Sequence, residues 1–362
     1  MSKAAELAAL IGSQTALSNR NLIINGAMQV SQRGDSTGKT SGGYHACDRF
    51  NSLINSAGTW SLSQSTTAPT GFSSSFKLDC TTADSSLAAG DYVILEQRIE
   101  GQNLQQLSFG TSSAKKLTLS FYVRSNKTGT YVAEIQHSGV AYNNNTYTIS
   151  SANTWEKKTI TVSGNTSAVI DNDNTEGMRV LFWLAAGSTY SGGTLTNNTW
   201  HSTEANRAAG QVNLADSTSN EWYITGVQLE VGEQATPFEH RSYGDELRRC
   251  QRYYYRHADG GDASSASVGT GAMYSSSALM CAVSFPVRMR ATPTLDHLNS
   301  SNAYRFWRSA NSDYFDNFNA FYDAHPLGGA MQADNNISGT AGDGGRVVLG
   351  GSAAYIAFDA EL

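Results

Sequence analysis

Side chains that could perform catalysis are dispersed along this sequence. The seven histidines are scattered, so the histidine base that a serine or cysteine nucleophile requires is not indicated. His45 and Cys47 are close neighbours, but one pair falls short of the ligand set of a metal site, and a structural histidine is preferred. The stretch Gly342 to Gly345 (GDGG) lacks the lysine and the helix of a phosphate-binding loop, which indicates a tight turn. We expect neither a cofactor nor a metal site from these residues.

Carboxylates raise two further possibilities. Asp171 to Gly177 (DNDNTEG) has the oxygen density of a calcium loop without the residue order of an EF-hand, and a solvated turn is the preferred interpretation. Glycan cleavage needs two carboxylates held several ångströms apart, which spacing in a sequence cannot show. Glu96 and Glu100 are interpreted as outward polar residues of a strand. Because the chain also lacks the long repeats of a parallel β-helix, we predict a protein that is not an enzyme.

The residues best suited to recognition lie between Tyr304 and Pro326. Aromatic rings alternate there with Arg, Asp and Asn, which offers flat apolar faces for sugar rings beside polar groups for their hydroxyls. The same rings could fill a core instead, and this alternative is favoured for Phe315, Phe318 and Phe321. The candidate contacts to a glycan are Tyr304, Trp307, Asp313, Tyr314 and Tyr322.

A second candidate surface is the stretch Ala141 to Tyr147 (AYNNNTY). We expect a loop from which Tyr142 and asparagine side chains project, although most loops of this kind are only turns.

The elements that must position these side chains are predicted to be strands. Charged residues make up only 15% of the 362 residues, and 34 glycines accompany many Ser, Thr and Asn, a balance typical of short strands and turns. A formal net charge of -6 offers no general field to nucleic acid or to an anionic membrane, so we expect no nucleic acid partner and no membrane insertion. The start of the chain has no signal-peptide pattern, which predicts folding in a cytoplasm. The four cysteines are widely spaced and are predicted to be buried thiols.

The fold class is predicted to be all-β, with a jelly-roll sandwich followed by a second β domain. Residues 1–20 contain an apolar stripe that includes Leu7, Leu10 and Ile11, which suggests a docking helix, with a frayed terminal helix as the alternative. Residues 21–241 form the sandwich, 242–256 a linking helix and 257–362 the C-terminal β domain, with 257–275 read as a linker or loop. Predicted strands lie at 75–80, 92–99, 116–125, 130–136, 157–164, 178–187, 221–232 and 276–285, and a hairpin or bulged strand is expected at 21–30.

Four segments together resemble the tail-fibre and tail-tip proteins of tailed bacteriophages, especially those of marine and cyanobacterial hosts. They read NRNLIINGAMQVSQRG, ITGVQLEVGEQATPFEHRSYGDELRRCQRYYYR, FPVRMRATPT and YIAFDAEL, in the order that this family shows. The matching positions are Asn21 to Gly34, Gln228 to Glu239, Cys250 to Tyr255, Phe285 to Thr294 and Tyr355 to Leu362.

The resemblance implies a sandwich similar to carbohydrate-binding modules, joined by the Cys-Gln-Arg-Tyr-Tyr segment to a terminal β domain. It further implies a homotrimer on the virion tail, assembled in the host cytoplasm, with other tail or baseplate proteins and a host cell-surface glycan as partners. A purely structural adaptor is the competing hypothesis. Within this frame Arg33-Gly34-Asp35 is interpreted as a backbone turn and not as an adhesion ligand.

Overall fold

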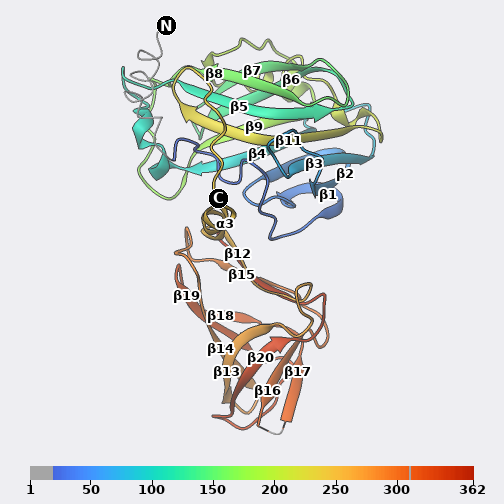
Figure 1. Cartoon of the computed structure of the whole chain (residues 1–362), viewed down its shortest axis with the longest axis vertical. Coiled ribbons are helices and arrows are strands. Elements are labelled where there is room, and N and C mark those ends of the chain that lie inside the picture. The colour runs from blue at the N-terminus through green and yellow to red at the C-terminus, as the bar shows by residue number, and fades with distance from the viewer. Residues whose placement is uncertain (1–18, 310) are drawn as a thin grey trace. The chain divides into compact units, whose positions relative to one another are not determined.

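The computed structural model describes residues 19–309 and 311–362, and it is built almost entirely from β-strands (Figure 1). The predicted N-terminal helix with Leu7, Leu10 and Ile11 lies outside these residues. The chain divides into two compact units, Met1–Glu246 with Leu362, and Leu247–Glu361. In the described part, no helix is both long and apolar enough to cross a lipid bilayer.

The first unit, drawn from blue to yellow in Figure 1, contains one curled sheet of eleven strands. Its strand order is β10-β7-β6-β9-β4-β2-β3-β11-β5-β8, and β1 pairs with β2. The strands are β1 (Ser36–Tyr44), β2 (Asn51–Ser65), β3 (Ser75–Thr82), β4 (Tyr92–Glu100), β5 (Leu117–Ser125), β6 (Gly129–His137), β7 (Ala141–Ile149), β8 (Glu156–Val162), β9 (Glu176–Ala186), β10 (Trp200–His201) and β11 (Glu221–Val231). Short helical turns connect some of them: η2 (Gly101–Asn103), η3 (Gln105–Leu107), α2 (Ser188–Ser191), η4 (Glu204–Asn206) and η5 (Leu214–Asp216).

The sheet folds over on itself and forms a two-layered sandwich around an aromatic core. The ring of Phe121 on β5 lies 5.1 Å from that of Tyr147 on β7 and 5.0 Å from that of Phe182 on β9. Alternate residues of β5, β6 and β8 enter this core, as the sequence predicted. Strand β9 is central and apolar on both sides, because Val180 and Phe182 face this core while Trp183 faces a smaller cluster.

The predicted bulge at Gly226 is confirmed. Gly226 has a φ of +63°, and the pairing of β11 with β5 shifts register between Thr225 and Gln228. Trp222 and Ile224 face the core before the bulge, and Val227 and Leu229 face it afterwards. The extra residue therefore lets the apolar side chains face the core on both sides of the bulge, although they stand at even positions before it and at odd positions after it.

Residues 21–30 do not form the predicted strand or hairpin. Asn25 has a φ of +59°, and its buried amide donates to the carbonyl oxygens of Val30 at 2.8 Å and Asp48 at 3.0 Å and accepts from Val30 N at 2.9 Å. The side chain thus replaces the hydrogen bonds that a partner strand would supply. The Arg33-Gly34-Asp35 stretch is a bend and not the predicted turn: Gly34 has a φ of +71° and forms an isolated antiparallel bridge with Ala46. Asp35 accepts a hydrogen bond from Gln64 N at 2.9 Å.

The linking helix predicted over 242–256 is present but shorter: α3 spans Tyr243–Gln251, and residues 254–256 belong to strand β12 (Tyr254–Asp259). The division between the two units falls within α3. Ser242 begins the helix by accepting a hydrogen bond from Asp245 N at 3.2 Å, and arginines occupy the last turn.

The second unit, drawn in orange and red, contains a three-stranded sheet, β12-β21-β15, and a seven-stranded sheet, β17-β16-β20-β13-β14-β19-β18. Residues 257–275 were expected to be a linker or loop, but they end β12 and supply β13. Gly271 fits a strand here because a Cβ atom would meet Met280 O at 2.8 Å, and Gly269 has a φ of +157°, which side chains disfavour. The strands are β12 (Tyr254–Asp259), β13 (Ser267–Ser275), β14 (Ala278–Ser284), β15 (Thr294–His297), β16 (Tyr304–Arg308), β17 (Asn311–Phe315), β18 (Ala320–His325), β19 (Gly328–Ala333), β20 (Gly344–Leu349) and β21 (Tyr355–Asp359).

The four cysteines are buried free thiols, as the sequence predicted. Burial raises the pKa of Cys80 to about 11 and that of Cys281 to about 12, which keeps both sulfurs protonated and unreactive at neutral pH.

Candidate functional site

Successive side chains of strands β16 and β17 point to opposite sides of the sheet, so the predicted recognition residues are divided between the two sides. Tyr304 and Phe306 point into the core of the second unit, whereas Trp307 is 41% exposed and points outward. On β17, Tyr314 lies opposite Arg305 and is 42% exposed, while Phe315 lies opposite Tyr304 and is fully buried. The favoured assignment of Phe315 and Phe318 to the core agrees with their burial, and Phe321 is half-buried against the same core.

Two arginines flank the outward rings. The guanidinium carbon of Arg305 lies 4.7 Å from the ring centre of Trp307 and 4.9 Å from that of Tyr314. Arg346 of β20 is paired directly with Trp307, and its guanidinium carbon lies 5.0 Å from the indole centre. We call these four residues, Trp307, Tyr314, Arg305 and Arg346, the arginine-aromatic face. Beside them lies a shallow hollow of about 350 Å³, lined by Arg305, Trp307, Arg308, Asn311 and Ser312.

Tyr322 is not part of this face. It is 51% exposed, but it lies on β18, at the other edge of the seven-stranded sheet from β17 and β16. Five strand steps separate β16 from β18, which is about 24 Å along the sheet at the usual strand spacing. A role of Tyr322 in binding stays a prediction, and it would need a long ligand or a separate contact.

Tyr304 and Asp313 require correction as candidate contacts. The Tyr304 side chain is fully buried, and its hydroxyl group donates to the carbonyl oxygens of Leu298 and Tyr355. Asp313 lies opposite Phe306 in the ladder, on the inward side, and its carboxylate accepts from Arg308 at 2.6 Å. Both residues hold the sheet in place because the two-residue period of the strands directs them away from the exposed face.

Tyr142 also occupies a different setting from the one expected, because residues 141–149 form strand β7 and not a projecting loop. The hydroxyl of Tyr142 donates to Glu204, and the guanidinium of Arg207 lies 4.1 Å from its ring centre. Arg207 in turn binds the buried Glu134 at 2.7 Å. The ring is therefore one part of a closed polar network, and only one edge of it remains half-exposed.

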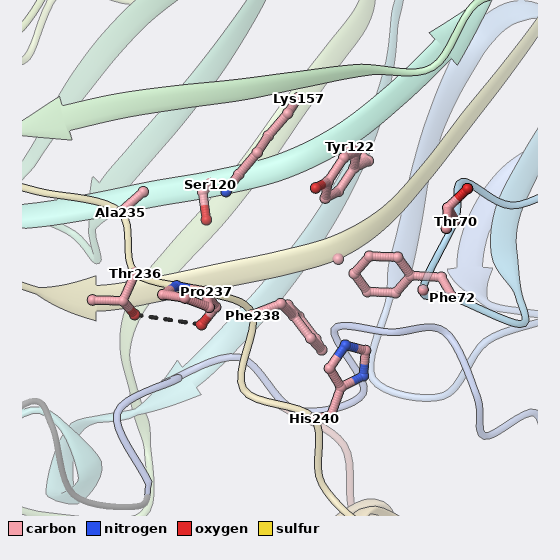
Figure 2. A pocket seen from close by; sticks show the side chains of 12 residues that line it. Thr70, Phe72, Ser120, Tyr122, Lys157, Ala235, Thr236, Pro237, Phe238 and His240 are labelled. Carbon is pink, nitrogen blue, oxygen red and sulfur yellow. Dashed lines mark hydrogen bonds between the residues drawn. The ribbon is translucent and has the colours of Figure 1, made fainter.

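The sandwich carries a pocket that the sequence did not indicate. It has a volume of about 500 Å³ and lies over the outer side of β5 and β11, between the turn at 70–72 and the segment 235–240 (Figure 2). Phe72 forms one wall, with its ring 5.4 Å from Tyr122, 5.0 Å from Phe238 and 5.2 Å from His240. We call it the sandwich pocket; its lining is Thr70, Gly71, Phe72, Ser120, Tyr122, Lys157, Gly226, Ala235, Thr236, Pro237, Phe238 and His240.

The bulge glycine shapes the floor of this pocket. A Cβ atom on Gly226 would meet the Phe72 ring at 2.7 Å and the Tyr122 ring at 2.9 Å. Phe72 stands in a Gly/Ser/Thr turn without periodicity, and Phe238 lies in a segment read as structural, so no local pattern joins them. Only the pairing of β3, β5 and β11 brings the rings together.

The acids considered for glycan cleavage are buried, and the expectation that they point outward as exposed polar residues is wrong. Glu96 accepts from Arg98 at 2.8 Å and from Asn51 at 3.0 Å, and Glu100 accepts from Gln102 at 2.6 Å. A neighbouring sheet strand and the connecting turn cover these carboxylates. In the turn at 171–177, Asp173 accepts hydrogen bonds from Thr175 N and Oγ1, as in an ordinary Asx turn. No group of three or more His, Cys, Asp or Glu that could hold a metal occurs among the described residues.

One nucleophile motif was missed in the sequence, namely Gly34 to Gly38 (GDSTG), which has Gly-x-Ser-x-Gly spacing. Ser36 Oγ lies 3.3 Å from Nδ1 of His45. However, Ser36 begins strand β1 and does not sit at a strand-to-helix turn, and no carboxylate pairs with His45 in the part of the chain that the structure describes. Burial, followed by Lys39 and Arg33, lowers the pKa of His45 to about 4, which makes it a weak base at neutral pH.

Comparison with known proteins found no matching family model and no matching curated protein. Among solved structures, the chain is similar to the enzymatically active domain of tailspike protein 4 of bacteriophage CBA120, with 13% identity, a TM-score of 0.29, and coverage of 59% of this chain and 22% of that one. It is also similar to the family 11 carbohydrate-binding module of Clostridium thermocellum, with 13% identity, a TM-score of 0.28, and coverage of 56% and 98%. A xylan-binding domain of family 22 gives 14% identity, a TM-score of 0.29, and coverage of 56% and 96%.

Proposed function

We propose that this protein is a non-catalytic glycan-binding protein of a bacteriophage tail fibre. The observation that carries the glycan-binding part is the arginine-aromatic face, where Trp307 and Tyr314 are exposed on strands whose opposite sides are buried in a core. Such strands hold the rings in fixed positions, so little conformational entropy is lost when a ligand binds.

The chemistry of this face suits a sugar ring. The flat apolar surface of an indole or phenol packs against the C–H groups of a pyranose, and adjacent N–H donors fix its hydroxyl groups. The indole N–H of Trp307 and the hydroxyl group of Tyr314 have no hydrogen-bond partner among residues 19–309 and 311–362, so both are available to a ligand.

The place in a virion is supported by the resemblance of the four sequence segments to tail-fibre and tail-tip proteins. In this proposal the N-terminal segment with Leu7, Leu10 and Ile11 docks on another tail or baseplate protein, and the chain assembles as a homotrimer in the host cytoplasm. Three copies on one particle would raise the effective concentration of weak sites without any new contact.

The test is binding of the purified full-length chain to surface polysaccharides extracted from a panel of bacteria and immobilised on a sensor. Trp307→Ala is expected to weaken binding by at least about tenfold, because a central aromatic anchor dominates small interfaces. Tyr274→Ala is the matched control, since Tyr274 is 79% exposed on β13 of the same sheet and does not belong to the face.

If Trp307→Ala and Tyr274→Ala lost the same amount of binding, or if Trp307→Ala bound as the parent chain does, the arginine-aromatic face would not be the glycan site. Retention of no polysaccharide at all would favour the structural adaptor, which would instead be captured by tail proteins. Shortening of a bound polysaccharide with time would show that the protein is an enzyme after all.

A further inference from the structure

We propose that the arginine-aromatic face selects a sugar residue that bears an acidic group, such as the carboxylate of a uronic acid. This inference rests on the proposed glycan binding and names the class of glycan. It follows from the charges on the face, from the free donors of the two arginines, and from the net charge of the whole chain.

The face carries two positive charges and no negative one. The outward positions of β17, β16 and β20 are Ser312 and Tyr314, Arg305 and Trp307, and Arg346, while Val348, the partner of Arg305 on β20, is buried. Neither Arg305 nor Arg346 has a carboxylate within ion-pair distance in the described ranges 19–309 and 311–362. By contrast, Arg308 on the inward side of the same strand is paired with Asp313 at 2.6 Å. The same strand therefore neutralises its inward arginine and leaves its outward arginine unpaired.

The guanidinium groups are placed to donate to a ligand at the rings. A guanidinium that lies over an aromatic ring keeps its N–H donors in its own plane, at the edge of the contact. Arg305 uses one nitrogen to donate to Ser312 Oγ at 2.7 Å, while its Nε–H is buried without a partner. Arg346 is exposed and makes no hydrogen bond through its side chain in the described part of the molecule. A carboxylate accepts two parallel N–H bonds from such a group, which no neutral hydroxyl can do.

Both positive charges lie beside Trp307. The face should therefore distinguish an acidic sugar that contacts the indole from an acidic polymer that does not. The whole chain has a formal net charge of -6, so its general field repels acidic polymers. Two local arginines favour an acidic ligand only when it approaches the indole closely, because a screened charge acts within about 8–10 Å at physiological salt. The hollow beside Trp307 admits one sugar residue and its acidic group at this distance. An acidic sugar residue that reaches the indole would therefore meet both guanidinium groups, whose carbons lie 4.7 and 5.0 Å from the ring centre.

The experiment compares matched polysaccharides on the same sensor, using polygalacturonate, hyaluronan and alginate, the carboxyl-reduced form of each, and neutral dextran. We expect retention of at least one acidic polymer and at least about tenfold weaker binding of its carboxyl-reduced form, since a hydrogen bond to a charged group is worth about one factor of ten or more. Arg346→Gln is expected to weaken binding of the acidic form about tenfold and to leave that of the reduced form unchanged. Arg288→Gln is the same substitution at an exposed arginine outside both the arginine-aromatic face and the sandwich pocket, and it is expected to have no effect.

Equal binding of an acidic polymer and its reduced form, or a preference for dextran, would overturn this inference while leaving the proposed glycan binding intact. An equal effect of Arg346→Gln and Arg288→Gln would also overturn it, because the attraction would then depend on net charge alone. Retention of no member of the panel, acidic or neutral, would count against glycan binding itself and therefore against both proposals. Thermal unfolding of Arg346→Gln, expected to match the parent chain because the side chain is exposed, verifies that the variant is folded.

Discussion

The sandwich pocket and the arginine-aromatic face hold their aromatic rings in different ways. On the sandwich, Phe72, Tyr122, Phe238 and His240 contact one another at ring-centre distances of 4.9–5.4 Å, and a glycine bulge beneath them lets the rings approach the sheet. On the C-terminal sheet, Trp307 and Tyr314 contact guanidinium groups instead.

This difference separates rings that stabilise the fold from rings that are free to bind. Ring-ring contacts cover apolar area mutually and contribute about 0.5–1.5 kcal/mol for each pair beyond that area. A guanidinium above a ring at an exposed site contributes about 0.5–1 kcal/mol and leaves the edges of both groups open to a ligand. We therefore expect substitutions in the sandwich pocket to change stability first, and substitutions in the arginine-aromatic face to change binding first.

The largest expected effect is a difference in stability between substitutions on the two sides of strand β16. Tyr304→Ala should lower the free energy of unfolding of the C-terminal unit by about 3–5 kcal/mol, because it empties a buried site and removes the hydroxyl group that bonds the carbonyl oxygens of Leu298 and Tyr355. Trp307→Ala should lower it by less than about 1 kcal/mol. Urea unfolding followed by circular dichroism measures both. Similar losses in the two variants would show that the outward ring is also structural.

The next effect tests the floor of the sandwich pocket. Gly226→Ala should destabilise the sandwich by about 2 kcal/mol, because Gly226 has a φ of +63° and the added Cβ would meet two rings at less than 3 Å. Gly344→Ala on β20 is the matched control, since nothing lies within 4 Å of its Cβ position. Urea unfolding of both variants should show a loss in the first and a change of less than about 0.5 kcal/mol in the second. A tolerated Gly226→Ala would mean that the rings move apart easily.

A smaller effect compares one ring from each surface. Phe72→Ala should cost about 1–2 kcal/mol of stability, because three ring contacts disappear from a half-buried site. Tyr314→Ala should cost less than about 0.5 kcal/mol and should weaken polysaccharide binding. Thermal unfolding and sensor binding of both variants measure the contrast directly. If Phe72→Ala were the variant that lost binding, the sandwich pocket would be the glycan site.

The smallest effect concerns pH and belongs to the sandwich alone. Burial lowers the pKa of His45 to about 4, so the folded state resists protonation while the unfolded chain takes up a proton near pH 6.5. The contribution of His45 to stability is therefore complete above pH 6.5 and is lost as the pH falls toward 4. The slope of unfolding free energy against pH, measured over this range, should be shallower in His45→Gln than in the parent chain. An unchanged slope would indicate that other histidines, such as the half-buried His257, account for the acid sensitivity.

Much of the fold was predictable because the buried sides of a strand appear in the sequence as a pattern of apolar residues. In β5 every second residue is apolar and faces the core, namely Leu117, Leu119, Phe121 and Val123. The continuous apolar run of β9 indicates a strand that is covered on both sides. The capped and amphipathic segment 243–251 predicted α3 for similar reasons. Strands β1, β2 and β7 were not predicted, because they are rich in Ser, Gly and Asn and carry only partial alternation.

The sequence was sufficient to locate the segment that contains the candidate site, but not to predict which of its side chains form the exposed face. The sequence alone determined that residues 304–326 concentrate aromatic and charged side chains, and that β-strands present them. Only the tertiary structure decided that Trp307 and Tyr314 face outward between Arg305 and Arg346, while Tyr304 and Asp313 turn inward. A shift of one residue in register reverses the side to which every side chain of a strand points, and register depends on partner strands. For β16 these partners are β17 and the distant β20, and for the rings of the sandwich pocket they are β3, β5 and β11, so no short stretch of sequence contains the information.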